Sequence, residues 1–464
     1  MNRAPDPSLS DYPRPPPGPD SGIKVIVVGA GIGGLSCAIE SRMLGHEVLV
    51  LEQTRAFLPL GDNIGIFPNS GRLMKRWGIH YELSKACAFT DGLEIRKYDG
   101  THIVFQPGRV KDAVDPDSTD IKINPFADAP LYDTERRHLH DILLKRAKEL
   151  GATIQQGIKV IGFSENAEGA TVEAGGTVYT ADVVIGADGV KSKAREVALG
   201  ILDAPKPSGY SIYRTSYSAD RIRANPVCAH LAVKGEDHRT VWIGPDAHFI
   251  HGTSQGGKYI HWLLTHLDTH DIEESWMLPG DPEAAKRLVK GWDPVIAAVI
   301  GTTPTGALID WKLVFRDPLP RWVSTGGRIA IMGDAAHPFL PTSQQGASAA
   351  VEDGVTIARC LLLAKEKGHP LSFALRAYQS LRYERVRKAQ QLGVDNRQMW
   401  HKIDWTKEID PESVKLPYAL WLWSHDATAY AIEHYDSVVK EMLPSQMGEV
   451  SSTPQTSGPI EVGA

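Results

Sequence analysis

A glycine-rich run near residue 30 has the spacing of a phosphate-binding turn. Gly29, Gly31 and Gly34 occupy the first, third and sixth positions of this run, directly after the apolar stretch IKVIVV and before LSCAIESRML. Glycines so placed allow a tight turn, the close approach of a pyrophosphate and close packing of a helix on a strand. The N-terminus of the helix also offers N–H donors to phosphates. A purely structural turn is the alternative interpretation of the glycines alone.

Glu52 supplies the second part of this pattern. It closes the apolar run EVLVLE, about 20 residues after the glycines, where a carboxylate can accept hydrogen bonds from both hydroxyls of a ribose. Strand, glycine turn, helix, second strand and acid together predict a dinucleotide site.

Two further segments place an aspartate just after an apolar run. Asp188 follows DVVI in the segment GADGVKSKAR, and Asp334 follows IAIM in the segment GDAAHP. An aspartate at a strand end can bind a sugar-alcohol hydroxyl, and Gly346 and Ala347, which open the next helix, can aim backbone N–H groups at an anionic ring edge. Either segment alone could be a simple turn. Together with the first motif, in this order, they form a specific pattern.

This order of motifs resembles that of the group A flavoprotein monooxygenases, the para-hydroxybenzoate hydroxylase superfamily, and within it the salicylate hydroxylase-like branch. A fourth segment, Arg136-Arg137-His138-Leu139, is similar to the Arg-x-x-Leu helix start of that family. The likeness extends from about residue 23 to residue 392.

The resemblance implies that the chain binds FAD, with the ADP half held by the glycine run and Glu52. It implies that Arg136 contacts the flavin nucleotide and that Asp188 belongs to a motif shared between FAD and NAD(P)H. It further implies that Asp334 binds the ribityl chain, while the loop that ends at Gly346 and Ala347 borders the isoalloxazine ring.

One segment departs from the family pattern. Relatives usually read Gly-Ala-Gly-Ile where this chain has Gly61-Asp62-Asn63-Ile64, ahead of Pro68-Asn69. Asp62 and Asn63 therefore put polar groups near the expected edge of the flavin.

The sequence contains one glycine fingerprint of this kind, so no dedicated nicotinamide domain is expected. The resemblance implies that NAD(P)H visits the flavin transiently and that O2 then gives a C4a-hydroperoxide, which hydroxylates a phenol-like or other aromatic substrate. Two alternatives stay open. One is an FAD-dependent oxidase or dehydrogenase of a small molecule, and the other is a flavin-bound redox sensor.

The substrate side is expected in the short alternating stretches of residues 208–270. By family position Arg214 and His251 border the substrate, and we expect these two residues to act in catalysis. Strand alternation puts His251 on one face with Phe249, and His248 on the other face with Ile250. A satisfied or solvent-facing imidazole is the alternative for each histidine, since a base must lie within hydrogen-bond reach of its proton. His337 is expected to be structural.

The elements that must position these residues indicate an α/β (α+β) chain. Runs of β-branched residues predict a parallel, Rossmann-like FAD-binding domain that is interrupted by an antiparallel-sheet substrate domain and followed by a helical region. The expected boundaries are a disordered lead-in over 1–22, an FAD-binding domain over 23–92, 127–207 and 310–370, a substrate-binding sheet over 93–126 and 208–309, a helical region over 371–444, and a flexible tail over 445–464.

Composition limits the function classes. With 42% apolar and 23% charged residues, most of the 464-residue chain should fold, and a net charge of −6 offers no overall attraction to nucleic acid or anionic lipid. The four dispersed cysteines suit neither a zinc site nor a disulfide framework, and no window holds 18 consecutive apolar residues. We therefore expect a cytoplasmic monomer or homodimer that takes a small aromatic substrate and O2, with no metal, nucleic-acid or membrane partner.

Overall fold

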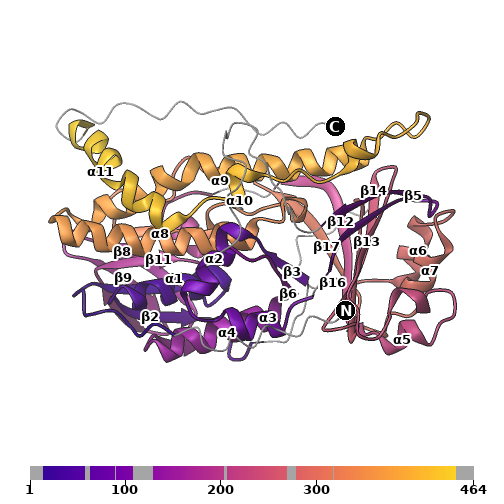
Figure 1. Ribbon diagram of the computed structural model, residues 1–464. Helices are drawn as coiled ribbons and strands as arrows, with labels where there is room; N and C mark the ends of the chain where they lie inside the picture. The colour runs from indigo at the N-terminus through magenta and orange to yellow at the C-terminus, as the bar shows by residue number, and fades with distance from the viewer. Residues whose placement is uncertain are drawn as a thin grey trace.

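The computed structural model describes residues 14–57, 63–88, 90–107, 129–202, 206–268, 278–316 and 318–445, and every structural statement below concerns these residues. Figure 1 shows two sheet-based bodies side by side, with long helices along one side, one of which extends from the first body to the second.

The first body is built on a five-stranded parallel sheet. Its strand order is β18-β11-β1-β2-β7. The strands are β1 (Lys24–Val28), β2 (Glu47–Glu52), β7 (Thr153–Gln156), β11 (Val183–Gly186) and β18 (Ile329–Ile331). The apolar residues of β1 and β11 are buried because helices cover one face of the sheet and a smaller sheet covers the other. The fold class is the expected one.

Helices α1 (Ile32–Met43), α4 (Arg136–Glu149) and α8 (Gly346–Lys367) pack on this sheet. A small antiparallel sheet of β8 (Val160–Glu165), β9 (Ala170–Ala174) and β10 (Thr177–Ala181) covers the other face. Strands β3 (Asn63–Ile66) and β6 (Tyr132–Glu135) form a separate antiparallel pair, followed respectively by α2 (Pro68–Arg76) and by α4. Helix α3 (His80–Lys85) lies between α2 and β6 in the chain.

The second body is an eight-stranded sheet in the order β16-β17-β12-β15-β14-β13-β4-β5. Its strands are β4 (Gly92–Lys97), β5 (His102–Pro107), β12 (Lys206–Ser218), β13 (Arg239–Gly244), β14 (Ala247–Ser254), β15 (Tyr259–Leu267), β16 (Leu278–Pro279) and β17 (Ile309–Phe315). All neighbours pair antiparallel except β13 and β4, which are parallel.

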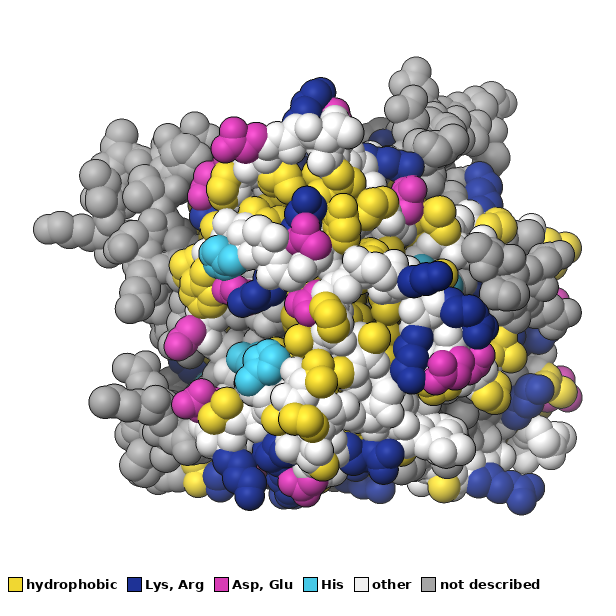
Figure 2. All heavy atoms as spheres, turned by 90° about the vertical axis from the view of Figure 1, so that its right-hand side faces the viewer, with side chains coloured by type: hydrophobic (Ala, Val, Ile, Leu, Met, Phe, Trp, Pro, Cys, Tyr) yellow, Lys and Arg dark blue, Asp and Glu magenta, His cyan; other side chains and the backbone are white. Residues whose placement is uncertain are grey.

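The two faces of this sheet have different partners. On the outer face, Tyr213, Phe249 and Trp262 join one apolar cluster with α5 (Asp220–Arg223), α6 (Pro282–Leu288) and α7 (Pro294–Gly301), which lie beyond the sheet in Figure 1. Figure 2 looks onto this outer side, where Lys and Arg side chains gather along the lower edge and hydrophobic side chains lie over the upper and central part. On the inner face, Ile212 packs against Leu340 and Val394, so this face is turned toward the FAD-binding motifs.

Three helices complete the chain. Helix α9 (Leu371–His401) runs along α8 and on to the eight-stranded sheet, and α11 (Ala427–Ser445) packs against both α8 and α9. The short helix α10 (Leu420–Trp423) lies between α9 and α11 in the chain and contacts α2. Within the described chain, no helix has the length and apolar character needed to cross a membrane.

Residues 14–22 differ from the expected lead-in. The N–H of Gly18 donates to Arg42 O at 3.1 Å, the N–H of Ser21 donates to Gly45 O at 3.0 Å, and the Arg14 side chain binds Glu149. An extended, proline-rich segment can therefore use the C-terminal end of α1 as its hydrogen-bond partner. The rest of the expected lead-in and nearly all of the expected tail lie outside the described residues.

Candidate functional site

The glycines of the first motif lack a side chain for two different reasons. A Cβ atom on Gly34 would collide with the carbonyl oxygen of Gly29, and one on Gly29, whose φ is +106°, would collide with the carbonyl oxygen of Ala187. These two glycines are required by the packing of the protein itself. A Cβ atom on Gly31 would meet no atom within 4 Å. Gly31 therefore leaves open space at the N-terminus of α1, as the approach of a pyrophosphate requires.

Glu52 lies directly beside this turn. Its carboxylate accepts the N–H of Ala30 and the N–H of Thr54, each at 2.8 Å, and the residue is 9% exposed. Each carboxylate oxygen has a further lone pair, so the group can also accept hydrogen bonds from ribose hydroxyls.

Asp188 has a different environment from the one expected. Its carboxylate accepts the hydroxyl of Ser192 at 2.6 Å and the N–H groups of Lys193 and Ala194 at 2.7 and 3.0 Å. The side chain thus holds the turn that follows β11, where Ala187 abuts Gly29. The structure gives Asp188 a positioning role in the second motif, and its contact with FAD or NAD(P)H stays a prediction.

Asp334 faces a set of basic groups. Burial raises its pKa, while Arg136, His337 and Arg316 act in the opposite direction. Among the described residues none donates a hydrogen bond to its carboxylate, so Asp334 is available as an acceptor for a sugar-alcohol hydroxyl. The structure places Arg136 near enough to Asp334 for its charge to act on the carboxylate, and the contacts of both residues with FAD stay predictions. Arg316, at the end of β17, carries no motif and was not found from the sequence.

The first and third motifs meet at the start of α8. Hypothetical Cβ atoms on Gly33 and Gly333 would lie 3.1 and 3.2 Å from the Cβ of Ala350. Helix α8 begins at Gly346, and its first turn holds no acidic residue and no side-chain cap. Gly346 and Ala347 therefore present the positive end of a 22-residue helix beside both cofactor motifs.

A buried acid behind this helix end fixes the third motif. Asp353 accepts the N–H of Gly333 at 3.0 Å, the Nε2 of His337 at 2.5 Å and the Nε of Arg382 at 2.8 Å. His337 is held inside this cluster, which agrees with its expected structural role. Burial alone would raise the pKa of Asp353, but His337 and Arg382 outweigh it and hold the pKa below its ordinary value.

The neighbouring Glu352 ties four elements together. It accepts the Nδ2 of Asn69 at 2.5 Å and two nitrogens of Arg385 at 2.8 and 2.9 Å, and it also pairs with Arg382. Arg385 in turn donates to the carbonyl oxygens of Trp421 and Leu422. Helices α2, α8, α9 and α10 are therefore joined at one point.

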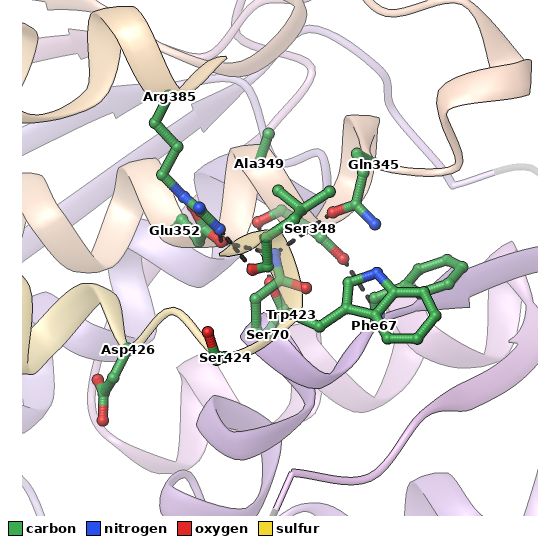
Figure 3. Close-up of polar contacts among 12 residues, drawn as sticks. Phe67, Ser70, Gln345, Ser348, Ala349, Glu352, Arg385, Trp423, Ser424 and Asp426 are labelled. Atoms are coloured by element: carbon green, nitrogen blue, oxygen red, sulfur yellow. Dashed lines mark hydrogen bonds and ion pairs between the residues drawn. The ribbon is translucent and has the colours of Figure 1, made fainter. Parts of the chain in front are cut away.

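Figure 3 shows this junction. The Trp423 ring lies 5.5 Å from that of Phe67, and the N–H of Phe67 donates to the Ser348 hydroxyl in the first turn of α8. This aromatic pair borders the end of α8 that carries Gly346 and Ala347.

Arg214 and His251 lie on opposite faces of the eight-stranded sheet. Arg214 is on the inner face, opposite Leu263 and Ile309, and its guanidinium lies 4.7 Å from the centre of the Trp311 ring. Burial lowers the pKa of Arg214 to about 10, so the group stays positive at neutral pH. Its position therefore fits the predicted substrate side.

His251 does not share that position. It is fully buried on the outer face, opposite Trp262, with Phe249 two residues earlier on the same face. The alternation of the strand is as predicted, but the face is the one covered by α5, α6 and α7. This geometry corrects the prediction that His251 borders the substrate.

Comparison with known proteins supports FAD as the cofactor. The chain matches the family described as "FAD binding domain" over residues 22–251 and 293–392. It is 33% identical over 443 residues to the FAD-dependent monooxygenase fsr3 of Gibberella fujikuroi, an alignment that covers 92% of this chain and 82% of the relative. The chain belongs to the group A flavoprotein monooxygenases. As a member of this group it binds FAD and acts with O2 on a small molecule.

Solved structures place the monooxygenase in the same fold. The crystal structure of CtdE in complex with FAD and substrate 4 has a TM-score of 0.82 and 31% identity, and the match covers 91% of this chain and 100% of that one. A salicylate hydroxylase substrate complex, with a TM-score of 0.71 and 23% identity, shares the fold over 88% of this chain and 97% of its own.

Proposed function

We propose that this monooxygenase uses NAD(P)H and O2 to hydroxylate an aromatic substrate that bears a phenol-like or acidic oxygen. The observation that carries the proposal is the half-buried Arg214 guanidinium, which lies on the inner face of the eight-stranded sheet and over the ring of Trp311. The reaction places one oxygen atom of O2 in the product and the other in water, with two electrons from NAD(P)H.

FAD supplies the redox and oxygen chemistry when bound. Gly31 and Glu52 would hold its pyrophosphate and adenosine ribose, and Asp334 with Arg136 would hold its central part. The start of α8, at Gly346 and Ala347, would direct backbone N–H groups toward the flavin ring.

Arg214 would act on the substrate. A positive charge in a buried setting favours the ionised form of a nearby hydroxyl, because the surroundings screen the attraction less than water does. An ionised hydroxyl makes an aromatic ring richer in electrons and hence easier to hydroxylate. The contact with the Trp311 ring restricts the positions of the guanidinium, which suits a directed contact with oxygen.

NAD(P)H would visit the flavin without a domain of its own. The sequence has one Gly-x-Gly-x-x-Gly turn after a strand, and the structure uses that turn in the single parallel sheet of the described chain. Enzymes with a separate nicotinamide domain normally carry two such turns.

The test is a screen of phenols and aromatic acids with purified holoenzyme. We expect a subset to stimulate oxidation of NADH or NADPH and to give a product heavier by one oxygen that derives from ¹⁸O-labelled O2. An FAD that is reduced anaerobically by a small molecule alone, with no NAD(P)H, would show an oxidase or dehydrogenase instead. Nicotinamide oxidation that no compound stimulates would also overturn the proposal.

A further inference from the structure

A second polar position lies beside Arg214 on the inner face. The strand register places Arg239 opposite Gly252, and Gly252 opposite His261. Directly opposed residues of neighbouring strands share a face, so these three positions form a row across β13, β14 and β15. Arg214 is paired with Leu263, two residues from His261, which makes Arg214 and His261 diagonal neighbours about 7 Å apart at their Cβ atoms.

Arg239 is fixed from the FAD-binding body. Its guanidinium forms an ion pair with Asp133 of β6, and Asp133 also accepts the Nδ2 of Asn63 at 2.5 Å. Asp133 is 4% exposed and the Arg239 side chain 27% exposed, so this pair spans the boundary between the two bodies with its acid buried and its base partly exposed. Burial lowers the pKa of Arg239 to about 10, and the side chain therefore stays positive at neutral pH.

His261 occupies the space that Gly252 leaves open. A Cβ atom on Gly252 would collide with the Nε2 of His261 and would lie 2.7 Å from its Cε1, so the imidazole ring lies over the glycine. The residue is 7% exposed, and its Nε2 is buried with no hydrogen-bond partner in the part of the chain that the structure describes. A buried polar atom of this kind normally has a partner.

His261 is neutral in this environment. Burial lowers the pKa of His261 to about 3, and the charge of Arg239 acts in the same direction. A neutral imidazole carries one donor and one acceptor nitrogen, so it can bind a hydroxyl or a carbonyl oxygen of a ligand. It is poorly suited to take up a proton beside a fixed guanidinium.

We propose that His261, supported by Gly252 and Arg239, is a substrate-positioning residue that binds a second oxygen substituent of the aromatic substrate. The inference rests on the proposed function and deepens it. Arg214 would bind the oxygen that activates the ring, and His261 would bind an oxygen elsewhere on the same molecule. The favoured substrate class is therefore an aromatic compound with two separated oxygen substituents.

The test compares probes with one and two such substituents. Substrate stimulation of NAD(P)H oxidation is measured for 2-naphthol and for 2,6- and 2,7-dihydroxynaphthalene, with the wild type and the variants His261→Phe, His261→Gln and Gly252→Ala. We expect His261→Phe to raise KM for the better dihydroxy probe about tenfold, as loss of one good hydrogen bond predicts, and to change KM for 2-naphthol less than twofold. His261→Gln should recover part of this difference. Gly252→Ala should resemble His261→Phe although its imidazole is intact.

His266→Phe is the matched control. His266 lies on the same strand but on the outer face, where it stacks on Tyr213. The variant His266→Phe should leave both KM values unchanged. FAD content and melting temperature are recorded for every variant.

Three other outcomes have distinct meanings. Equal KM changes for mono- and dihydroxy probes would overturn the inference and make His261 a structural residue. Loss of a limb of the pH–kcat profile in His261→Phe would also overturn it, because His261 would then be a base. Failure of the wild type to respond to any naphthol or to any compound of the wider screen would mean that the proposed function itself is wrong.

Discussion

The Oδ2 atom of Asp353 accepts both the Nε2 of His337 at 2.5 Å and the backbone N–H of Gly333 at 3.0 Å. One oxygen on α8 therefore fixes both ends of the short turn that carries Asp334. The N-terminus of α8 and the carboxylate of Asp334 are positioned as one unit. A substitution in the Asp353 cluster should therefore affect the cofactor site more than it affects the eight-stranded sheet.

The glycine turn gives a matched pair of substitutions. Gly31→Ala should leave the melting temperature of the apoprotein nearly unchanged, since the added Cβ meets no atom within 4 Å, but should weaken FAD binding by obstructing the pyrophosphate. Gly34→Ala should destabilise the apoprotein itself by about 1–3 kcal/mol, because its Cβ meets the Gly29 carbonyl oxygen. Thermal unfolding and FAD titration separate the two effects. Equal loss of stability in both variants would contradict this reading of the turn.

Asp334→Ala should weaken FAD binding while the protein stays folded. The carboxylate has no donor among the described residues, and the loss of its hydrogen bonds to the cofactor, at about 1.5–3 kcal/mol each, predicts a Kd for FAD raised by one to several orders of magnitude. Flavin fluorescence titration of the apoprotein measures the Kd. Asp395→Ala, at an exposed position on α9, is the control. An unchanged Kd for Asp334→Ala would remove Asp334 from the site.

The Glu352 cluster predicts a pH dependence of stability. Burial would raise the pKa of Glu352, but Arg385 and Arg382 outweigh it and hold the pKa well below its ordinary value. The contribution of Glu352 to stability is therefore complete above its unfolded-state pKa of about 4.3. It is lost as the pH falls from there toward the pKa of Glu352 in the folded state. At pH 7, Glu352→Gln should lower the free energy of unfolding by about 3–5 kcal/mol, because it leaves buried arginines without their partner.

Urea unfolding at several pH values checks this prediction. The difference between the wild type and Glu352→Gln should shrink as the pH is lowered through 4, while Glu433→Gln, at an exposed position on α11, should differ little from the wild type throughout. A difference in the free energy of unfolding that grows toward low pH would show that the predicted sign of the pH dependence is wrong.

His251 offers a test of the corrected face assignment. Both of its ring nitrogens are buried without a hydrogen-bond partner among the described residues, in an apolar layer with Phe249 and Trp262. His251→Leu should therefore raise the free energy of unfolding by about 1 kcal/mol or more, since it removes unsatisfied polar atoms from that layer. Guanidinium unfolding measures this change. A stable variant with greatly reduced turnover would restore His251 to the catalytic residues.

Residues whose contacts are local or follow a strand end could be predicted from the sequence. The glycine turn, Glu52 and Asp334 belong to short segments whose spacing determines how they lie. The face of His251 was not predictable in this way, because alternation shows which residues share a face, whereas the packing of α5, α6 and α7 decides which face is covered.

Contacts between residues far apart in the sequence could not be predicted either. Arg239 and Asp133 are 106 positions apart, and neither belongs to a motif. The acids Glu352 and Asp353 were visible in the sequence, but Arg382 and Arg385 become their partners only through the packing of α9 on α8. The motif of Asp188 did not predict that its side chain holds the turn after β11, and its contact with a cofactor stays a prediction.

Substrate-dependent incorporation of oxygen by the wild type and by Arg214→Ala tests the proposed hydroxylation most directly. With ¹⁸O-labelled O2, NAD(P)H and a phenol from the screen, the wild-type holoenzyme should give a product that contains one ¹⁸O atom. Arg214→Ala should retain FAD but lower kcat/KM about 10- to 100-fold, as loss of a charge-assisted hydrogen bond predicts, and its activity should shift to higher pH because the substrate hydroxyl would ionise less readily. Nicotinamide oxidation without labelled product in the wild type, or full activity of Arg214→Ala at neutral pH, would contradict this assignment.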